Sequence, residues 1–310
     1  MYDILIVGGG PAGLTAAIYA RRAGKTVLVL EGTGFGGQIA ASHLVENYPA
    51  IPSVSGAAYS DALTAQAKAL GAETRFGRVS AVRREEERFI LTAGKKEFEG
   101  RSLILATGAK HRTLGVEREE DLVGRGVSYC AVCDGAFFRD KDVAVVGGGD
   151  SALQAVLFLS GVVRHVTLIH RREELRAQGS DVERARTREN VELLLNSRVT
   201  GLLGEEKLTG LTLEGKDGSR RELAVEGLFI EVGQEPDNAA FASLAGLDEG
   251  GYFRAGEDCR TETPGVFVAG DCRSKALRQL TTAVSDGSIA ATAACRWLDE
   301  KGGEQVSRGG

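Results

Sequence analysis

A strand–loop–helix–strand unit with a glycine-rich loop occurs twice in this chain, and this repeat constrains the fold more than any other feature. In the first copy, the apolar run at residues 3–7 leads into the loop Gly8–Gly13, which has the pattern G-x-G-x-x-G. A helical segment at 14–23 and a strand at 26–30 follow. Glycines in this pattern make a tight turn, admit a pyrophosphate close to the backbone and let the helix pack closely on the strand. The first copy therefore predicts a nucleotide-binding unit.

The second copy repeats this order of elements further along the chain. Its strand, loop, helix and second strand are expected at residues 142–146, 147–152, 152–159 and 165–169. In both copies, 23 residues separate the first loop glycine from the end of the second strand: Glu31 follows Gly8, and His170 follows Gly147. One such loop alone is often a surface turn, but two copies with matching spacing and flanks favour two nucleotide sites.

The residues at the end of the second strand differ between the two copies. A carboxylate there, as in Glu31, suits the hydroxyl pair of an unmodified ribose and repels a 2′-phosphate. Arg171 and Arg172, with Arg176 a turn further on, favour a 2′-phosphate through charge-assisted hydrogen bonds. The alternative for these arginines is a solvated basic surface. The contrast predicts FAD at the first site and NADPH at the second.

Two further strand ends carry the small residues typical of a ligand site. Ala106-Thr107-Gly108 follows one expected strand, and Gly270-Asp271 follows another far downstream. Because these segments lie on opposite sides of the second copy, they predict one domain interrupted by another. We expect an FAD-binding domain at residues 1–112 and 240–310, with an NADPH-binding domain inserted at 113–239. The fold class is α/β, with two Rossmann-like, three-layer nucleotide-binding domains.

The segments between these motifs have simpler patterns. Residues 74–100 are expected to form a small antiparallel meander that covers the first sheet. Residues 208–225 have the pattern of a hairpin, with Lys216-Asp217-Gly218 as its turn. A helix is expected at 287–298, packed on the FAD-binding domain.

Composition narrows the classes of protein to which the chain can belong. Its 310 residues suggest about two domains, and a net charge of −5 argues against nucleic acid as the main partner. Met1-Tyr2 leads directly into a strand without the pattern of an export signal, and no apolar run has the length of a membrane span. One close pair and three single cysteines fit a reducing compartment. We expect a cytoplasmic protein without a membrane partner.

The close cysteine pair lies in Cys130-Ala131-Val132-Cys133-Asp134, just before the second glycine loop. Two thiols at this spacing can close a small disulfide ring and carry two electrons. The alternative is part of a zinc site, but the other cysteines and the four histidines are scattered, so no metal is expected. The position of the pair between two nucleotide units indicates a relay between a redox cofactor and an external group.

Taken together, these motifs resemble those of the low-molecular-weight, bacterial-type thioredoxin reductases, and the likeness runs from Met1 to Trp297. Cys-Ala-x-Cys-Asp is the most specific shared motif. Further matching segments are Gly36-Gly37-Gln38, Glu46-Asn47-Tyr48-Pro49, Arg278-Gln279, Thr282-Ala283, Asp286-Gly287, Gly149-Asp150-Ser151-Ala152 and His170-Arg171-Arg172 with Arg176. The resemblance implies FAD and NADPH as cofactors, a homodimer, and thioredoxin or a similar small dithiol protein as electron acceptor.

The loops and the resemblance together define the expected sites. The FAD site comprises Gly8, Gly10, Pro11, Ala12, Gly13, Glu31, Gly37, Gln38, Asn47, Ala106, Thr107, Gly108, Gly270, Asp271, Arg278, Gln279 and Thr282. The NADPH site comprises Gly147, Gly149, Asp150, Ser151, His170, Arg171, Arg172 and Arg176. By resemblance, Cys133 is the flavin-facing sulfur and Cys130 attacks the disulfide of the partner.

A proton must also be supplied to a leaving thiolate. Asp134 is the nearest candidate acid or base, since no histidine is close in sequence; its alternative role is to cap a helix or turn. The predicted activity is therefore that of an NADPH-dependent thioredoxin-disulfide reductase. Two other functions compete with it: a flavin-dependent dithiol oxidase that uses oxygen, and a non-catalytic nucleotide-binding redox sensor. The arginines count against the oxidase, and the intact cysteine pair counts against the sensor.

Overall fold

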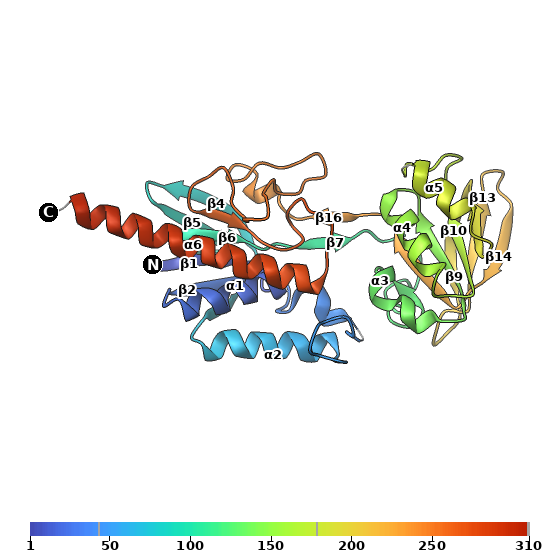
Figure 1. Cartoon of the computed structure of the whole chain (residues 1–310), viewed down its shortest axis with the longest axis horizontal. Coiled ribbons are helices and arrows are strands. Elements are labelled where there is room, and N and C mark those ends of the chain that lie inside the picture. Colours follow the sequence, from blue (N-terminus) through green and yellow to red (C-terminus); the bar gives the residue numbers. More distant parts are fainter. Residues whose placement is uncertain (43, 178, 309–310) are drawn as a thin grey trace. The chain divides into compact units, whose positions relative to one another are not determined.

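The chain folds into two compact units. The computed structural model describes residues 1–42, 44–177 and 179–308 (Figure 1). Unit 1 comprises residues 1–110 and 235–310, and unit 2 comprises residues 111–234. The chain therefore changes unit slightly before the expected boundaries. At the two crossings, β7 (Ala109–His111) pairs with β16 (Gln234–Pro236). Among the described residues, no helix combines the length and apolar character needed to cross a membrane.

A seven-stranded sheet forms the centre of unit 1. Its strands are β1 (Tyr2–Val7), β2 (Val27–Glu31), β3 (Glu73–Phe76), β4 (Val79–Glu85), β5 (Arg88–Ala93), β6 (Lys96–Leu105) and β17 (Val266–Val268). The order is β3-β2-β1-β6-β5-β4, with β17 also paired to β6. The first half of β6 pairs antiparallel with β5, and its second half pairs parallel with β1 and β17. The expected meander at 74–100 is thus joined to the parallel sheet through one shared strand.

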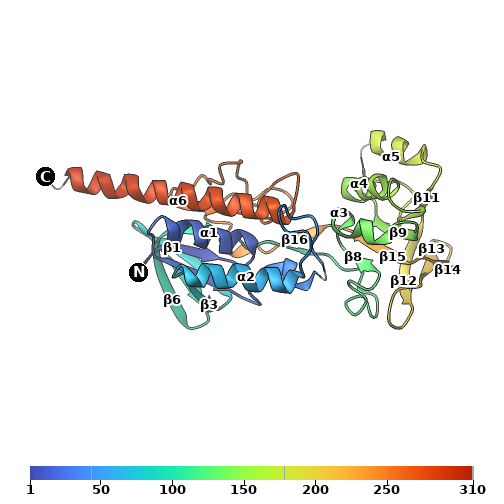
Figure 2. The same ribbon diagram turned by 60° about the horizontal axis from the view of Figure 1, so that its bottom comes forward.

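Both faces of the parallel strands in unit 1 are covered, which is why these strands are apolar throughout. Ile4 and Ile6 belong to a core cluster with the helices, whereas Leu5 and Val7 belong to a second cluster with Phe89 of the meander. The helices are α1 (Pro11–Arg22), α2 (Gly56–Ala69) and α6 (Leu280–Arg308), with the 3-10 turns η1 (Gly37–Ala41) and η3 (Ala239–Phe241). Figures 1 and 2 show α1 between α2 and α6.

Unit 2 contains a five-stranded parallel sheet in the order β11-β10-β9-β15-β8. These strands are β8 (Val127–Ser128), β9 (Asp142–Gly147), β10 (His165–Ile169), β11 (Val191–Leu194) and β15 (Gly227–Glu231). The helical segments are α3 (Ala131–Asp134), η2 (Gly135–Phe138), α4 (Asp150–Leu159) and α5 (Gly179–Arg186). A smaller antiparallel sheet consists of β12 (Ser197–Leu203), β13 (Gly210–Gly215) and β14 (Arg220–Ala224).

The two faces of the sheet in unit 2 also have different coverings. Val143 and Val145 pack with α4, and Ala144 packs with β13 residues Leu211 and Leu213. In Figure 1, α4 and β13 accordingly lie on opposite sides of β9 and β10. The expected hairpin at 208–225 is the β13–β14 pair. In each unit the two faces of the central sheet pack against different elements, so each unit has three layers, as the α/β prediction requires.

The glycine loops hold the strand ends close together. Gly8 has a φ of +109°, and a Cβ atom there would lie 2.1 Å from the Ala106 carbonyl oxygen. A Cβ on Gly13 would lie 1.9 Å from the Gly8 carbonyl oxygen. In unit 2, a Cβ on Gly147 would lie 2.4 Å from the Glu231 carbonyl oxygen. Only glycine permits these backbone contacts, so the loop pattern is required by packing as well as by ligand binding.

Gly13→Ala should therefore destabilise unit 1 strongly, because its new methyl group meets backbone atoms that cannot move aside. Gly10→Ala is a matched control in the same loop, since Gly10 has a φ of −79° and the nearest atom to its Cβ position is 3.8 Å away. We expect a loss of about 2–3 kcal/mol for Gly13→Ala and less than about 1 kcal/mol for Gly10→Ala. Urea unfolding of the FAD-free protein measures both, and equal losses would contradict the packing argument.

Candidate functional site

Three segments distant in sequence meet at the carboxyl ends of the parallel strands in unit 1. The Gly8 loop follows β1, Ala106–Gly108 follows β6, and Gly270–Asp271 follows β17. Gly270 has a φ of +84°, and a Cβ there would lie 2.8 Å from the Cβ of Ala12. In doubly wound sheets, ligands bind at this edge. The structure thus brings these expected FAD-binding segments together.

Glu31 ends β2 and organises the loops around it. One carboxylate oxygen accepts a hydrogen bond from the Gly9 N–H at 2.7 Å, and the other accepts from the N–H groups of Thr33 at 2.7 Å and Gly34 at 3.2 Å. A carboxylate has about four acceptor directions, so Oε2 retains capacity for a ribose hydroxyl. The geometry agrees with the expected role of Glu31 and adds a second one, because the same side chain holds two loops.

The remaining expected FAD-binding residues surround the same edge. A Cβ on Gly37 would lie 3.2 Å from the Gly10 Cα, so the segment containing Gln38 lies against the first loop.

Asn47 Nδ2 donates to Gln279 Oε1 at 3.2 Å. The Arg278 guanidinium is held within the protein, because Nε donates to the Asp271 carbonyl at 3.2 Å and the group lies 4.1 Å from the ring centre of Tyr252. The Thr282 hydroxyl accepts from the Gln279 N–H at 3.1 Å.

Asp271 provides a test of whether the edge fits FAD. Its Oδ1 atom is buried and has no hydrogen-bond partner within the described part of the chain. Burial raises the pKa of this carboxyl, while the charges of Lys275 and Arg278 oppose the shift. Buried polar atoms are nearly always satisfied, so an orphaned acceptor at a ligand edge requires a donor from outside the chain. The hydroxyl groups of the FAD polyol are donors of this kind, and the residues therefore fit the cofactor.

The corresponding edge of unit 2 has the features of a site that binds the phosphates of a nucleotide. Gly149 precedes α4 and no side chain caps this helix, so its first N–H groups are available to an anion. Asp150 and Ser151 begin the helix. A Cβ on Gly148 would lie 2.2 Å from the buried His170 ring, whose Nε2 has no partner in the described structure.

The arginines expected to bind a 2′-phosphate lie beside the glycine loop of unit 2. Arg171, Arg172 and Arg176 are exposed and follow the end of β10. The Arg176 N–H donates to the Gly148 carbonyl at 2.6 Å, which places the arginine segment against the glycine loop. Exposed guanidinium groups beside a phosphate loop fit NADPH, and the residues expected for it from Gly147 to Arg176 all lie at this edge.

Cys130 and Cys133 form a disulfide at the start of the short helix α3. The Cys133 N–H donates to Cys130 Sγ at 3.2 Å, so the backbone of the helix orients the first sulfur. Both cysteines are partly buried, whereas Val132 between them is 53% exposed. Within unit 2, the segment that carries the disulfide is therefore only partly covered.

Asp134 is joined to this disulfide by one hydroxyl group. Ser128 Oγ donates to Asp134 Oδ2 at 2.6 Å and accepts from the Cys130 N–H at 3.0 Å. Burial raises the pKa of Asp134, although the hydrogen bond from Ser128 opposes the shift. A carboxyl with a raised pKa beside a disulfide can hold the proton that a thiolate requires, as the sequence suggested.

Comparisons with known proteins agree with these sites. The sequence model of the family "Pyridine nucleotide-disulphide oxidoreductase" matches residues 2–287. The chain belongs to this family. It is 45% identical to thioredoxin reductase of Listeria innocua over 302 residues, which is 97% of this chain and 95% of the relative. It is 42% identical to thioredoxin reductase of Bacillus subtilis, over 97% of this chain and 96% of the relative.

A solved structure is similar over the whole chain. The crystal structure of thioredoxin reductase from Streptococcus pyogenes superposes with a TM-score of 0.93 at 39% sequence identity, covering 97% of this chain and 99% of the other. The resemblance, the α/β fold and the disulfide reductase activity predicted from the sequence are thereby confirmed. The cofactors of the family are FAD and NADPH, as predicted.

Glu231, which the sequence analysis missed, is a second carboxyl near the disulfide of this family member. It is the last residue of β15, lies beside Gly147 in the sheet register, and accepts a hydrogen bond from the backbone N–H of Ala131. Burial raises its pKa to about 7, and the Ala131 hydrogen bond opposes the shift. The sequence feature that could have identified Glu231 is its position as an acidic residue directly after the apolar run 228–230.

The other cysteines do not extend the site. Cys259, Cys272 and Cys295 are free thiols, and all three are buried. Burial raises the pKa values of these thiols, which keeps them protonated. Among residues 1–42, 44–177 and 179–308, no group of three or more His, Cys, Asp or Glu side chains is arranged to hold a metal ion.

The raised pKa of Glu231 predicts a specific dependence of stability on pH. The folded chain retains this proton up to about pH 7, whereas the unfolded chain releases it near pH 4.5. The contribution of Glu231 to stability is therefore present below pH 4.5 and is lost as the pH rises to 7. Glu231→Gln should remove this loss, which amounts to at most about 1.4 kcal/mol per pH unit. Denaturant unfolding of the oxidised apoprotein between pH 4.5 and 7 measures the difference, and parallel curves for both proteins would contradict the assignment.

Proposed function

We propose that this chain is an NADPH-dependent thioredoxin reductase in which unit 1 binds FAD and unit 2 binds NADPH and carries the redox disulfide. The single observation that carries the proposal is the Cys130–Cys133 disulfide in a unit that also contains a glycine-rich loop before an uncapped helix. A homodimer and a cytoplasmic location belong to the same proposal and rest on the resemblance. Unit 1 would be the discontinuous FAD-binding domain, and unit 2 the inserted NADPH-binding domain.

Each cofactor has a set of residues suited to hold it. For FAD, Glu31 would bind a ribose hydroxyl, the Gly8 loop and the start of α1 would bind the pyrophosphate, and Asp271 would accept from the polyol. For NADPH, the start of α4 would bind the pyrophosphate, and Arg171 and Arg172 would pair with the 2′-phosphate. When bound, NADPH and FAD would supply hydride transfer, which no side chain of the protein can provide.

The cysteines perform the exchange with the protein substrate. Two electrons and two protons convert the Cys130–Cys133 disulfide into two thiols. The Cys130 thiolate attacks the disulfide of thioredoxin, which forms a mixed disulfide and releases one thioredoxin thiolate. Cys133 then attacks Cys130 Sγ, re-forms the internal disulfide and releases the second thioredoxin thiolate. The two thiolates take up protons, so thioredoxin leaves as a dithiol.

Asp134 is placed to act in this exchange, because Ser128 connects it with the backbone of Cys130. Its carboxyl would hold a proton for a thiolate leaving group. Glu231 contacts the same helix start from the end of β15 and offers a second site for a proton. Two such carboxyls near the disulfide suit a reaction that moves two protons for each two electrons.

Anaerobic titration with NADPH tests the proposal. The flavin of the wild-type protein should lose its visible absorbance with NADPH and regain it when oxidised thioredoxin is added. The Cys130→Ser/Cys133→Ser variant is the control, because it retains both cofactor sites; its flavin should bleach with NADPH but transfer no electrons to thioredoxin. Failure of the wild type to bleach would exclude the reductase, and rapid recovery with oxygen alone would favour the dithiol oxidase.

The arginines of unit 2 should determine the choice of nicotinamide cofactor. Arg171→Ala/Arg172→Ala removes two cations expected to pair with the 2′-phosphate, which NADH lacks. We expect the KM for NADPH to rise about 100-fold, or about 2–3 kcal/mol, and the KM for NADH to change less than threefold. Steady-state kinetics with each nucleotide measures this. Equal effects on the two nucleotides would show that these arginines do not recognise the phosphate.

A further inference from the structure

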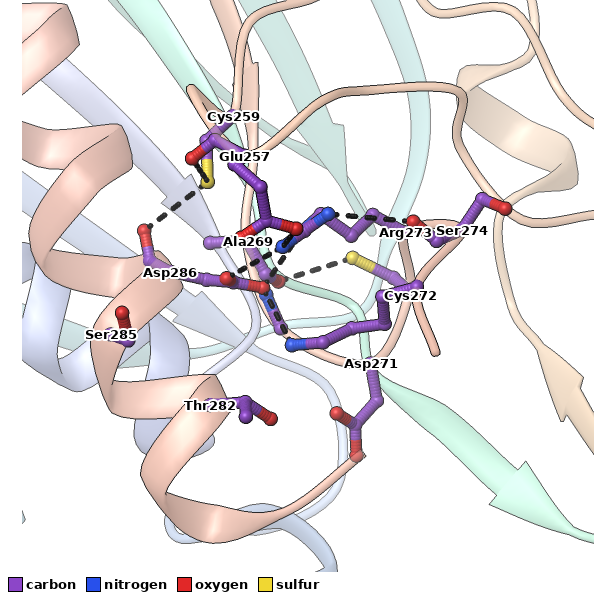
Figure 3. Close-up of polar contacts among 12 residues, drawn as sticks. Glu257, Cys259, Ala269, Asp271, Cys272, Arg273, Ser274, Thr282, Ser285 and Asp286 are labelled. Atoms are coloured by element: carbon purple, nitrogen blue, oxygen red, sulfur yellow. Dashed lines mark hydrogen bonds and ion pairs between the residues drawn. The ribbon is translucent and has the colours of Figure 1, made fainter. Parts of the chain in front are cut away.

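A cluster of buried charges lies beneath the Gly270–Asp271 turn (Figure 3). One member, Asp286, belongs to a segment that matches the family, but no role of its own was predicted for it from the sequence. The side chains of Arg273, Lys275 and Asp286 are 3%, 5% and 3% exposed. Asp286 Oδ2 accepts from Arg273 Nε at 2.8 Å, from Lys275 Nζ at 2.8 Å and from the Gly270 N–H at 3.0 Å. Asp286 Oδ1 accepts from Arg273 Nη2 at 3.0 Å. One carboxylate therefore binds two cations and one peptide group.

The charges in this cluster are not balanced within the protein interior. Burial alone would raise the pKa of Asp286, but hydrogen bonds from Arg273 and Lys275 overcome this effect and lower it. The other acid in contact, Glu257, lies 3.2 Å from Arg273 with its side chain 89% exposed. Burying an excess cation is costly, and such arrangements are weak evidence for stability alone. A role in the neighbouring site gives a reason for retaining the cluster.

The position of Asp286 connects the cluster to three elements of the FAD-binding edge. Asp286 lies on α6, and its bond to Gly270 ties this helix to the end of β17. The adjacent Gly287 lies against α1, since a Cβ there would be 2.2 Å from the Ala12 carbonyl oxygen. Gly270 also contacts Ala12, so two packing contacts and one charged hydrogen bond fix the turn.

The Gly270–Asp271 turn also sets the direction of the Asp271 carboxylate. The backbone that Asp286 holds at Gly270 leads directly into Asp271, whose carboxylate Figure 3 shows pointing away from that of Asp286. Asp271 Oδ1 is the buried acceptor without a partner in the described chain. A carboxylate that must meet a ligand hydroxyl at hydrogen-bond distance needs a backbone fixed to within about 0.5 Å. Asp286 provides this restraint.

We propose that Asp286 is a positioning residue of the FAD site, which clamps the Gly270 peptide so that Asp271 presents its carboxylate to a hydroxyl of the cofactor. This inference rests on the proposed binding of FAD by unit 1. Arg273 and Lys275 hold the Asp286 carboxylate in the orientation that the Gly270 N–H requires. The competing explanation is that the cluster only fastens α6 to β17 and leaves cofactor affinity unchanged.

The test compares Lys275→Met with Lys275→Met/Asp286→Asn. The single variant keeps the Arg273 pair and the Gly270 bond. In the wild type, Arg273, Lys275 and Asp286 together carry a net charge of one positive unit. The double variant leaves Arg273 as the one buried charge of the three, so the net charge of the cluster does not change. We expect its apoprotein to bind FAD about tenfold more weakly than the single variant, because the charge-assisted hydrogen bond that holds Gly270 is replaced by a weaker, neutral one. Quenching of FAD fluorescence measures the affinity, and thermal melting of the apoprotein measures the fold.

Asp299→Asn is the matched control on the same helix, where Asp299 pairs with Lys25 at the surface. It should change FAD affinity by less than about twofold. Equal FAD affinity in the Lys275 variant and the double variant, with a lower melting temperature for the double variant, would overturn the inference and leave a structural cluster. A wild-type apoprotein that takes up no FAD would instead overturn the proposed function as well.

Asp286→Glu decides the question if the double variant does not fold. It retains the charge but displaces the carboxylate by one methylene from the Gly270 N–H. We expect a weaker FAD affinity, by about threefold or more, in an apoprotein that still melts in a cooperative transition. Unchanged affinity in this folded variant would overturn the positioning role.

Discussion

The contact between the Gly8 backbone and the Ala106 carbonyl is the constraint on which unit 1 depends. A side chain at Gly8 would lie 2.1 Å from that oxygen, so β1 and β6 can end side by side only when this position is glycine. The same contact creates the edge at which the nucleotide loop, the Ala106–Gly108 segment and the Gly270–Asp271 turn converge. Unit 2 repeats the solution with Gly147 against the carbonyl of Glu231. In both units, therefore, the close approach of two neighbouring strand ends requires the loop glycine, independently of any ligand.

Much of this architecture could be predicted because its requirements are local. The second strand of the NADPH unit lies at 165–169 as expected, and the three strand ends of unit 1 meet where their small residues indicated. A few neighbouring residues are enough to indicate these strands and loops, because the pattern consists of spaced glycines next to apolar runs of strand length. The cysteine pair was equally accessible, since three positions of separation already permit the disulfide that the structure contains.

Features that depend on distant residues were less accessible. The last helix was expected at 287–298 but extends over Leu280–Arg308, because Gly287 does not begin the helix. Gly287 instead lets α6 pack against α1, since a Cβ atom at this position would lie 2.2 Å from the Ala12 carbonyl oxygen. Glu231 was not identified as a candidate for the sites, and Asp286 was noted only as part of a segment that matches the family. Their importance arises from groups far away in sequence, namely Ala131 for Glu231 and Gly270 for Asp286.

The buried carboxyls show how partners, rather than burial, separate structural from reactive acids. Burial raises the pKa values of Asp134, Glu231 and Asp271, and within the described part of the chain none of them accepts a hydrogen bond from a buried cation. Asp286 experiences the same penalty, yet its pKa falls because Arg273 and Lys275 donate to it. A carboxyl with its own cations is committed to holding structure, whereas one without them remains able to bind a proton or accept from a ligand. Of the three acids with raised pKa values, Asp134 and Glu231 lie near the disulfide, and Asp271 follows β17 at the edge of the sheet in unit 1. Asp286, whose pKa is lowered, holds the backbone immediately before Asp271.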